Sequence, residues 1–327
     1  MHLSDSFGRI HNYLRVSLTH RCNLRCFYCM PDENDQQFVN ETLMTATEIV
    51  GIAKIFCTNG VNKIRLTGGE PLVRKDAADI ILRLSALPAA ISLTTNAVRV
   101  HEFIEVFKKA GVKTLNISLD TLQEEKFNFI TRRNHFKQVV KNIELLLNNN
   151  FHVKLNVVVM KGVNDDEIND FIALTKNDPL HIRFIEFMPF DGNKWSSNKV
   201  LSLDEILNTA AHKYNYTKLP DEKNATAKKF SIAGHKGTFA IISTMTSPFC
   251  STCNRLRLTA DGKLKNCLFS TSETDLLTPF RNGENILPLI TGNIQDKAAA
   301  TGGQLSTDLT VLSAESLTNR SMINIGG

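Results

Sequence analysis

Short apolar runs rich in β-branched residues alternate with longer amphipathic stretches through the first two thirds of the chain. The apolar runs predict six strands, and the stretches between them predict helices, because their apolar residues recur with a period near 3.6. The strands are expected at 13–18, 62–67, 91–95, 113–119, 153–160 and 181–187. The helices are expected at 45–56, 76–87, 101–110, 135–149, 165–176 and 202–213.

Regular alternation of strands and helices predicts an α/β fold with a parallel sheet and right-handed crossovers. Six such units, without the usual eight of a closed barrel, favour an incomplete (β/α)6 TIM-like barrel over an open wound sheet.

The pattern changes after residue 215. Antiparallel strands are expected within 230–243, and a hairpin at 255–258 and 263–267 is predicted by the turn Asp261-Gly262. Helices should follow near 272–281 and 283–300, and residues 301–327, rich in Gly, Ser, Thr and Asn, predict a mobile tail. We therefore expect a partial barrel at 1–215, a C-terminal antiparallel and helical extension at 216–300, and a Gly-Gly-ended tail at 301–327.

Composition narrows the class of protein. The chain has 327 residues, 42% of them hydrophobic, and a formal net charge of +5. We find neither a cleavable signal pattern nor an apolar run near the roughly 18 residues of a membrane span, so a cytoplasmic enzyme without a membrane partner is expected. The basic residues are dispersed, which permits a phosphate-rich ligand but does not indicate a nucleic acid partner.

Six of the seven cysteines fall into two sets of three: Cys22, Cys26 and Cys29, and Cys250, Cys253 and Cys267. In the reducing cytosol, spaced cysteines are metal ligands or reactive thiols more often than disulfides. A structural zinc site uses four protein ligands, whereas three thiolates on a cubane iron–sulfur cluster leave one iron open. The two sets therefore favour catalytic iron–sulfur clusters.

Zinc is the ordinary alternative at both sets. His20 or Cys57 would complete the first site, although Cys57 lies on an apolar helical face typical of a buried thiol. His235 is the nearest candidate to complete the second, and it lacks a paired ligand spacing.

Polar and glycine-rich segments follow the predicted strands, at the rim where parallel α/β proteins bind ligands. These segments are 22–29 after the first strand, 68–71 after the second, 94–96 after the third, 118–120 after the fourth and 188–189 after the sixth.

The first cysteine set, with the spacing C-x3-C-x2-C and Tyr28 before its last member, resembles the motif of the radical S-adenosylmethionine superfamily. Gly68-Gly69-Glu70 resembles the superfamily segment that receives the methionine amine. The resemblance implies a [4Fe–4S] cluster whose open iron holds S-adenosylmethionine, and an electron that cleaves it to a 5′-deoxyadenosyl radical.

The second set lies in the segment FCSTCNRLRL at 249–258, followed by NCLF at 266–269, and this pattern resembles the GTP 3′,8-cyclases of molybdenum cofactor biosynthesis, the MoaA family. Further matches run through the chain: RLTGGEPL at 65–72, NISLD at 116–120, RFIEFM at 183–188 and Gly326-Gly327 at the end. The resemblance implies a second [4Fe–4S] cluster that binds the guanine of GTP, and a tail that enters the active site.

The implied reaction converts GTP to (8S)-3′,8-cyclo-7,8-dihydroguanosine 5′-triphosphate, the first step of molybdopterin biosynthesis. The radical removes the 3′ hydrogen of the ribose, the carbon radical attacks C8 of guanine, and one electron and one proton complete the product. No catalytic side chain is expected beyond the clusters and the radical cofactor. The implied partners are a companion cyclic pyranopterin synthase and a reductant protein, and the resemblance is compatible with a homodimer.

Individual contacts follow from the same resemblance. Residues matching GTP contacts are Arg15, Arg65, Thr94, Lys154, Arg255, Leu256 through its backbone, and Arg257. Residues matching S-adenosylmethionine contacts are Tyr28, Gly69, Ser118 and Met188. Both arginines of Arg255-Leu256-Arg257 should face the substrate, since alternate strand residues point the same way.

Some of these positions have ordinary structural interpretations. Met188 beside Phe187 fits a core filler, and Ser118 fits a helix cap. Arg183 has two interpretations: it pairs with a carboxylate at the first cofactor site, or it forms an ordinary ion pair with Glu186 or Asp120. Ala97 stands where the family commonly has glycine, so a positive φ there would be strained.

Other functions stay open. Another radical enzyme with an auxiliary cluster, modifying a peptide or a tetrapyrrole, would share the cysteines but not the Arg-Leu-Arg run. A noncatalytic iron–sulfur electron carrier should have four protein ligands per cluster. A zinc-stabilised binding module is the third alternative.

Overall fold

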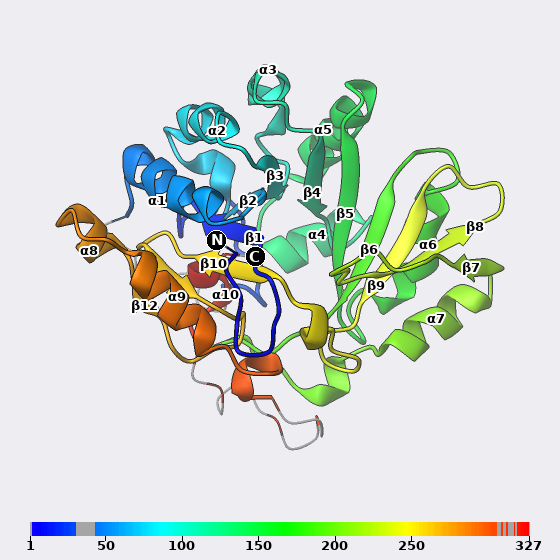
Figure 1. Cartoon of the computed structure of the whole chain (residues 1–327). Helices are drawn as coiled ribbons and strands as arrows, with labels where there is room; N and C mark the ends of the chain where they lie inside the picture. The colour runs from blue at the N-terminus through cyan, green and yellow to red at the C-terminus, as the bar shows by residue number, and fades with distance from the viewer. Residues whose placement is uncertain are drawn as a thin grey trace.

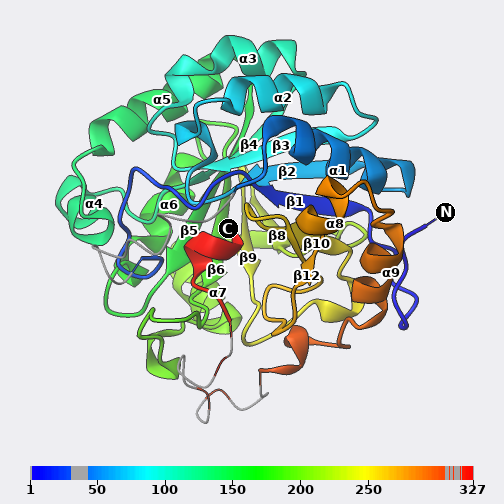
Figure 2. The same ribbon diagram turned by 90° about the vertical axis from the view of Figure 1, so that its left-hand side faces the viewer.

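A computed structural model describes residues 2–30, 43–305, 309, 312, 317 and 319–326. Within these residues the strands form one 12-stranded sheet in the order β12-β11-β10-β1-β2-β3-β4-β5-β6-β9-β8-β7. The sheet curves into an arc with helices on its outer side, and its two edge strands, β7 and β12, are not paired with each other (Figures 1 and 2). The predicted incomplete barrel is confirmed.

The barrel part is a run of parallel strands, each paired with the next in chain order. Its strands are β1 (Tyr13–Ser17), β2 (Lys63–Thr67), β3 (Ala90–Thr95), β4 (Thr114–Ser118), β5 (His152–Val159) and β6 (His181–Glu186). The helices that follow them are α1 (Ala46–Thr58), α2 (Ala77–Ser85), α3 (Ile104–Lys109), α4 (Glu124–Thr131), α5 (Phe136–Asn148), α6 (Ile168–Leu174) and α7 (Leu203–Ala211). All six predicted strands are present.

Local signals fix several helix starts. Thr45 caps α1 and Ser202 caps α7, and each is paired with a glutamate three residues on that bonds back to the cap backbone. Short 3-10 turns at Val100–Glu102 and Asp165–Glu167 precede α3 and α6, which are shorter than predicted. Helix α4 lies where no element was predicted, because its eight residues carry a weak apolar pattern.

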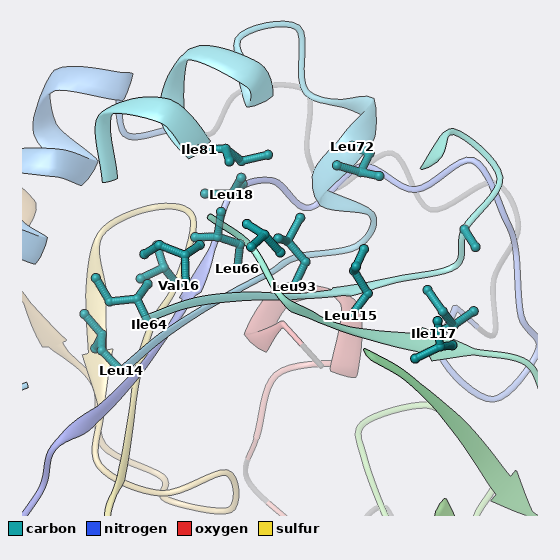
Figure 3. Close-up of a cluster of buried hydrophobic side chains, with 14 of the residues drawn as sticks. Leu14, Val16, Leu18, Ile64, Leu66, Leu72, Ile81, Leu93, Leu115 and Ile117 are labelled. Atoms are coloured by element: carbon teal, nitrogen blue, oxygen red, sulfur yellow. The ribbon is translucent and has the colours of Figure 1, made fainter. Parts of the chain in front are cut away.

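Alternation along the strands separates two faces of the sheet. One face is apolar and packs against the outer helices, as Figure 3 shows for strands β1 to β4 and Ile81 of α2. The labelled strand residues of this layer are Leu14, Val16, Ile64, Leu66, Leu93, Leu115 and Ile117. The opposite, inner face carries polar and charged residues at the intervening positions, so the inside of the arc is suited to a polar ligand rather than to a packed apolar core.

The C-terminal region extends both edges of the barrel sheet. Strand β9 (Thr238–Ile242) pairs in parallel with β6 and in antiparallel with β8 (Lys228–Ile232), which pairs with β7 (Tyr216–Lys218). On the other edge, β10 (Arg255–Leu258) runs parallel to β1 and forms the predicted hairpin with β11 (Lys263–Lys265). The division at residue 215 stays a prediction, and the sheet runs across it.

The predicted C-terminal helices are shorter than expected. They are α8 (Leu277–Arg281) and α9 (Leu287–Gln295), and the start of the first predicted helix instead forms the edge strand β12 (Thr274–Asp275). In the part of the chain that the structure describes, no helix is long and apolar enough to cross a membrane.

The described end of the tail packs against the body of the molecule. Helix α10 (Met322–Ile325) lies within the arc of the sheet in both views, with Ile323 3% and Ile325 1% exposed. For these residues the prediction of a mobile tail is wrong. Although the segment is rich in Ser and Asn, Ile323 and Ile325 anchor this small helix by burying their side chains. Gly327 lies outside the described residues.

Candidate functional site

The first cysteine loop is held against the Gly-Gly-Glu segment by backbone contacts. Gly69 N donates to Thr19 O at 2.8 Å, and Glu70 N donates to Arg21 O at 2.8 Å. A Cβ on Gly69 would lie 2.5 Å from Arg21 O, so only glycine permits this approach. The backbone that approaches Gly69 closely is therefore that of residues 19–21, at the start of the cysteine loop.

Glu70 joins the ends of β2 and β3 beneath that loop. Its carboxylate accepts hydrogen bonds from Leu72 N, Thr95 Oγ1 and Asn96 N. Burial raises the pKa of Glu70 to about 7, although these donors oppose the rise. Asn96 in turn donates to Asn23 Oδ1 at 2.8 Å and to Cys22 Sγ at 3.7 Å, which ties the third strand end to the first cysteine.

The three cysteines of the first set are half-buried, and carboxylates lie nearby. Burial, followed by Glu70, raises the pKa of Cys22 to about 11, and burial, followed by Cys22 and Asp120, raises that of Cys29 to about 12. Burial and Asp120 also raise the pKa of Cys26. The thiols influence one another, as neighbouring ligands of one cluster would.

The predicted S-adenosylmethionine contacts gather beside this loop. Tyr28 donates its hydroxyl to Asp120 Oδ2 at 2.6 Å, and it packs with Met188 in an apolar cluster that includes Phe187. Ser118 is half-buried at the end of β4. Met188 therefore contacts the apolar cluster and is only partly buried. Its position is compatible with a core filler and with a contact to S-adenosylmethionine.

The second cysteine loop has a different environment. Cys250 begins a 3-10 turn, Cys253 ends it, and Cys267 follows β11. Arg255 Nη2 and Lys297 Nζ each lie 3.6 Å from Cys253 Sγ, and Thr301 N donates to Cys250 Sγ at 3.3 Å.

This environment is cationic. Burial raises the pKa of Cys253, but Arg255 and Lys297 outweigh burial and bring it to about 6. Burial raises the pKa of Cys250. The backbone N–H of Thr301 opposes this rise, and the charge of Cys267 adds to it. The lowered pKa of Cys253 favours the thiolate that an iron ligand needs.

Between the two loops, the inner face of the sheet is lined by cations. Strand pairing places Arg15 beside both Arg65 and Arg257, and alternation places Leu256 in the apolar layer while Arg255 and Arg257 face inward. The inward-facing cations of the parallel strands β1, β2, β5, β6 and β10 are Arg15, Lys63, Arg65, Lys154, Arg183, Arg255 and Arg257.

These cations repel one another and are depleted of hydration. Burial, followed by Arg257, lowers the pKa of Arg15, and burial, followed by Arg183, lowers that of Lys154 to about 8. Burial, followed by Arg255, lowers the pKa of Arg257 to about 10. Such a cluster favours an anionic ligand strongly, because each charge lies near others of the same sign.

Several buried polar atoms on this face have no hydrogen-bond partner within the described residues: Tyr13 OH, Arg15 Nε, Thr94 Oγ1, Asn156 Oδ1 and Arg183 Nε. Buried polar groups are normally paired, so unpaired donors and acceptors pointing at one space indicate a polar ligand there. Arg15, Thr94, Lys154 and Arg257 lie on this one face of the sheet, and their role as nucleotide contacts stays a prediction.

Two further predictions are answered by geometry. Ala97 adopts φ +63°, the strained conformation expected if alanine replaces glycine there, and Asn142 supports it by donating to Ala97 O at 2.6 Å. Arg183 donates to Asn116 Oδ1, whereas Glu186 accepts from Met245 N and Asp120 from Tyr28. The interpretation of Arg183 as an ordinary ion pair is therefore wrong, because the amide of the neighbouring strand lies nearer its guanidinium.

The described end of the tail enters the same space. Gly326 O accepts from Arg257 Nη1 at 2.6 Å, and a Cβ on Gly326 would lie 2.7 Å from Thr67 Oγ1. Gly326 has φ +83°, so its lack of a side chain is required by both conformation and space.

Sequence reasoning missed three contributors. Lys63 was detectable, because it precedes Arg65 by two residues and so lies on the same face. Tyr13 beneath Lys63 and Arg65, at 4.8 and 5.4 Å from its ring centre, follows from the same rule. Lys297 gave no signal, because a single lysine after a helix carries no motif.

No group of three or more His, Cys, Asp or Glu in the described ranges is close enough to hold a single metal ion. The ligands of a four-iron cluster bind different iron atoms and lie farther apart than the ligands of one ion, so this finding does not bear on a cluster.

Comparison with known proteins supplies two family matches. Residues 16–175 match the radical SAM superfamily, and residues 180–302 match the family described as Molybdenum Cofactor Synthesis C.

Curated relatives cover nearly the whole chain. The mitochondrial GTP 3′,8-cyclase of Arabidopsis thaliana is 45% identical over 99% of this chain and 83% of its own length. The GTP 3′,8-cyclase of Peptoclostridium acidaminophilum is 42% identical over 90% of this chain and 92% of its own. Molybdenum cofactor biosynthesis protein 1 of Mus musculus is 46% identical, and the chain spans about half of that relative, 51% of its length.

Among solved structures, Streptococcus suis SuiB bound to S-adenosylmethionine matches with a TM-score of 0.64 at 14% identity, covering 89% of this chain and 70% of that one. This likeness supports the fold. Taken with the curated relatives, the matches show that the chain belongs to the radical SAM superfamily and, within it, to the family of GTP 3′,8-cyclases of molybdenum cofactor biosynthesis.

Proposed function

We propose that the chain converts GTP to (8S)-3′,8-cyclo-7,8-dihydroguanosine 5′-triphosphate, the first step of molybdopterin biosynthesis. The observation that carries this proposal is the cationic inner face of the sheet, which lies between two different three-cysteine loops. Superfamily membership supports S-adenosylmethionine and an iron–sulfur cluster as cofactors. The second [4Fe–4S] cluster, at Cys250, Cys253 and Cys267, is part of the proposal.

The inward-facing cations bind and orient the nucleotide. Guanidinium groups pair with phosphate oxygens through parallel N–H donors, so Arg15, Arg65 and Arg257 are suited to the triphosphate. Lys154 adds a point charge from the far side of the arc, and Thr94 Oγ1 offers an unpaired buried hydroxyl. A triphosphate would relieve the mutual repulsion that lowers the pKa of Arg15 and Lys154.

The residues beside the first loop position S-adenosylmethionine. Close backbone packing at Gly69 holds the cysteine loop against the end of β2, while Tyr28 and Met188 present an aromatic and a thioether surface. Ser118 ends β4 with a half-buried side chain.

Three thiolates from each loop would hold a cluster, with N–H donors to sulfur from Leu24 N at the first loop and Thr301 N at the second. When bound, the first cluster supplies the electron that cleaves S-adenosylmethionine. The protein's own part is to exclude water and to hold the ribose between the two sites, since a reactive radical must meet its target without diffusing.

The test is an anaerobic assay of the protein reconstituted with iron and sulfide, supplied with a reductant and S-adenosylmethionine, with and without GTP. We expect strong GTP-dependent formation of 5′-deoxyadenosine together with a cyclised nucleotide. Formation that ignores GTP would retain the radical chemistry and refute the substrate. The absence of formation in a fully clustered protein would favour the electron carrier.

The proposed setting is the reducing cytoplasm, with a reductant protein as electron donor and a pterin-forming synthase as consumer of the product. A 3′,8-cyclised nucleotide still has to rearrange into a pterin, so an enzyme of that class must follow. Fractionation of cells should recover the chain with the cytoplasmic proteins.

A further inference from the structure

Residues 3–12 form a small closed loop, the N-terminal clasp, before the first strand. A bridge between Ser4 and Ile10 closes it, and His11 N donates to Leu3 O at 2.7 Å. At its centre lies Asp5, a residue that is 5% exposed. Its carboxylate accepts hydrogen bonds from Arg9 N at 3.0 Å and from Arg9 Nε at 2.5 Å. The carboxylate therefore fixes the direction of the Arg9 side chain.

The other nitrogens of Arg9 reach the second cysteine loop. Nη1 donates to Cys250 O at 2.9 Å and to Ala299 O at 2.8 Å, and Nη2 donates to Ala298 O at 2.9 Å. One planar guanidinium thus joins two segments distant in sequence, the turn that begins at Cys250 and the irregular segment after α9. Lysine carries its three donors on one nitrogen, so it lacks the planar fork that holds the Asp5 carboxylate and these carbonyls along separate edges.

The second of those segments also contacts cysteine sulfur and its partners. Thr301 N donates to Cys250 Sγ at 3.3 Å, and Lys297 Nζ lies 3.6 Å from Cys253 Sγ. Both groups are within a few residues of the carbonyls that Arg9 holds. The position of the donors to sulfur therefore depends on the contacts made by Arg9.

Further bonds attach the clasp on either side. Asn254 Nδ2 donates to Asn12 Oδ1 at 2.6 Å, and Gln295 Nε2 donates to Ser4 O at 2.8 Å. The clasp is visible in both views as the first, blue loop lying against α9 (Figures 1 and 2).

We propose that Arg9 is a positioning residue for the second cluster, oriented by Asp5, and that it holds the Cys250 turn and residues 298–301 in the arrangement that retains the cluster. This proposal rests on the second cluster of the proposed function. Arg9 acts through the backbone carbonyls of Cys250, Ala298 and Ala299 rather than through sulfur.

The experiment isolates the second cluster. In a variant with Cys22, Cys26 and Cys29 changed to alanine, iron and sulfide per chain are measured after anaerobic reconstitution, and the rate of cluster loss to a chelator is followed by absorbance. Adding Arg9→Met should speed that loss by about tenfold or more, the usual effect of removing a partner that orients a metal ligand. Asp5→Asn should act in the same direction, and adding it to Arg9→Met should give little further effect.

Arg74→Met is the matched control. Arg74 pairs with Asp76 at 2.6 Å and donates to the carbonyls of Leu18 and Met44, both at 2.7 Å, so it resembles Arg9 but serves another region. In the second-cluster background, Arg74→Met should leave the loss rate unchanged. In the reciprocal background, with Cys250, Cys253 and Cys267 changed to alanine, Arg9→Met should leave the first cluster unchanged.

The outcomes separate the two proposals. A second-cluster background that binds no iron refutes the second cluster and with it this role of Arg9. An intact cluster that is lost at the same rate with and without Arg9→Met overturns the role of Arg9 alone. Equal acceleration at both clusters would also overturn it, because it would indicate general destabilisation of the fold.

Discussion

The two cysteine loops have the same number of thiols, and side chains of opposite charge lie beside them. At the first, Glu70 and Asp120 add to burial and raise the pKa of Cys22 and Cys29 to about 11 and about 12. At the second, Arg255 and Lys297 bring the pKa of Cys253 to about 6. Two sets of three cysteines can therefore serve different chemistry, because the charges around each set favour a different charge state of the cluster that it is proposed to hold.

The difference matches the proposed division of labour. Cations and N–H donors near the ligand sulfurs stabilise the more reduced, more negative state of a cluster and raise its potential, whereas nearby carboxylates lower it. A low potential suits the electron that must cleave S-adenosylmethionine. A cationic second site suits the binding of an anionic nucleotide.

The largest expected effect comes from removing each set of cysteines. Replacing Cys22, Cys26 and Cys29 with alanine should reduce S-adenosylmethionine cleavage to background, because the proposed cluster that binds the cofactor needs these three thiolates. Replacing Cys250, Cys253 and Cys267 should leave cleavage measurable and reduce the cyclised nucleotide to background. Chromatography of 5′-deoxyadenosine and of the nucleotides measures both.

Cys57→Ala is the control for these variants, since this buried thiol on α1 belongs to neither set. It should keep both products. Equal loss of cleavage in the two triple variants, with the remaining cluster intact, would refute the division of labour.

Arg15→Met should lower the affinity for GTP by about 10- to 100-fold, since charge-assisted hydrogen bonds contribute roughly 1.5–3 kcal/mol. The same change removes a charge repelled by Arg257 and Arg65, so the free energy of unfolding should stay equal or rise by about 1 kcal/mol. Calorimetric titration with GTP and thermal unfolding give the two quantities. A less stable protein with unchanged affinity would contradict the assignment of the inner face to the ligand.

Lys297→Met tests the cationic second site directly. Loss of this charge beside Cys253 should lower the potential of the second cluster by about 60 mV, a tenfold shift of a one-electron equilibrium, and should leave the first unchanged. Redox titration followed by electron paramagnetic resonance resolves the two clusters. A shift of the first cluster, or a rise of the second, would show that the comparison of the two surroundings is mistaken.

Ala97→Gly gives the smallest expected effect, at the loop beside the first site. The left-handed conformation destabilises the fold by roughly 1–2 kcal/mol when the residue is not glycine. Glycine removes this strain, but its greater freedom in the unfolded chain offsets about 0.4–1 kcal/mol of the gain. We expect a net stabilisation of about 1 kcal/mol in denaturant unfolding. Destabilisation would mean that the Ala97 methyl contributes more by packing than its backbone loses by strain.

Sequence reasoning succeeded where a rule links neighbouring residues. The six strands follow from their apolar runs, and Arg255 and Arg257 face inward as two-residue periodicity requires. The strain at Ala97 follows from one substitution in a recognisable loop. Each of these depends on local geometry that the chain carries in consecutive positions.

What sequence could not supply depends on distant contacts. Arg9 reaches Cys250 across 241 positions, and Lys297 reaches Cys253 across 44, with no motif to connect either pair. The burial of α10 depends on the space within the arc, which no tail composition reveals. Helix α4 was missed because its stability comes from tertiary packing rather than from its own pattern.

If the two loops hold clusters with different ligands, each cluster should respond spectroscopically to its own ligand alone. Electron paramagnetic resonance spectra are recorded for the two triple-alanine variants, each reduced and then given S-adenosylmethionine or GTP. We expect S-adenosylmethionine to change the spectrum only when Cys22, Cys26 and Cys29 are present, and GTP only when Cys250, Cys253 and Cys267 are present. A response of either cluster to the other's ligand, or of the second cluster to neither, would contradict it.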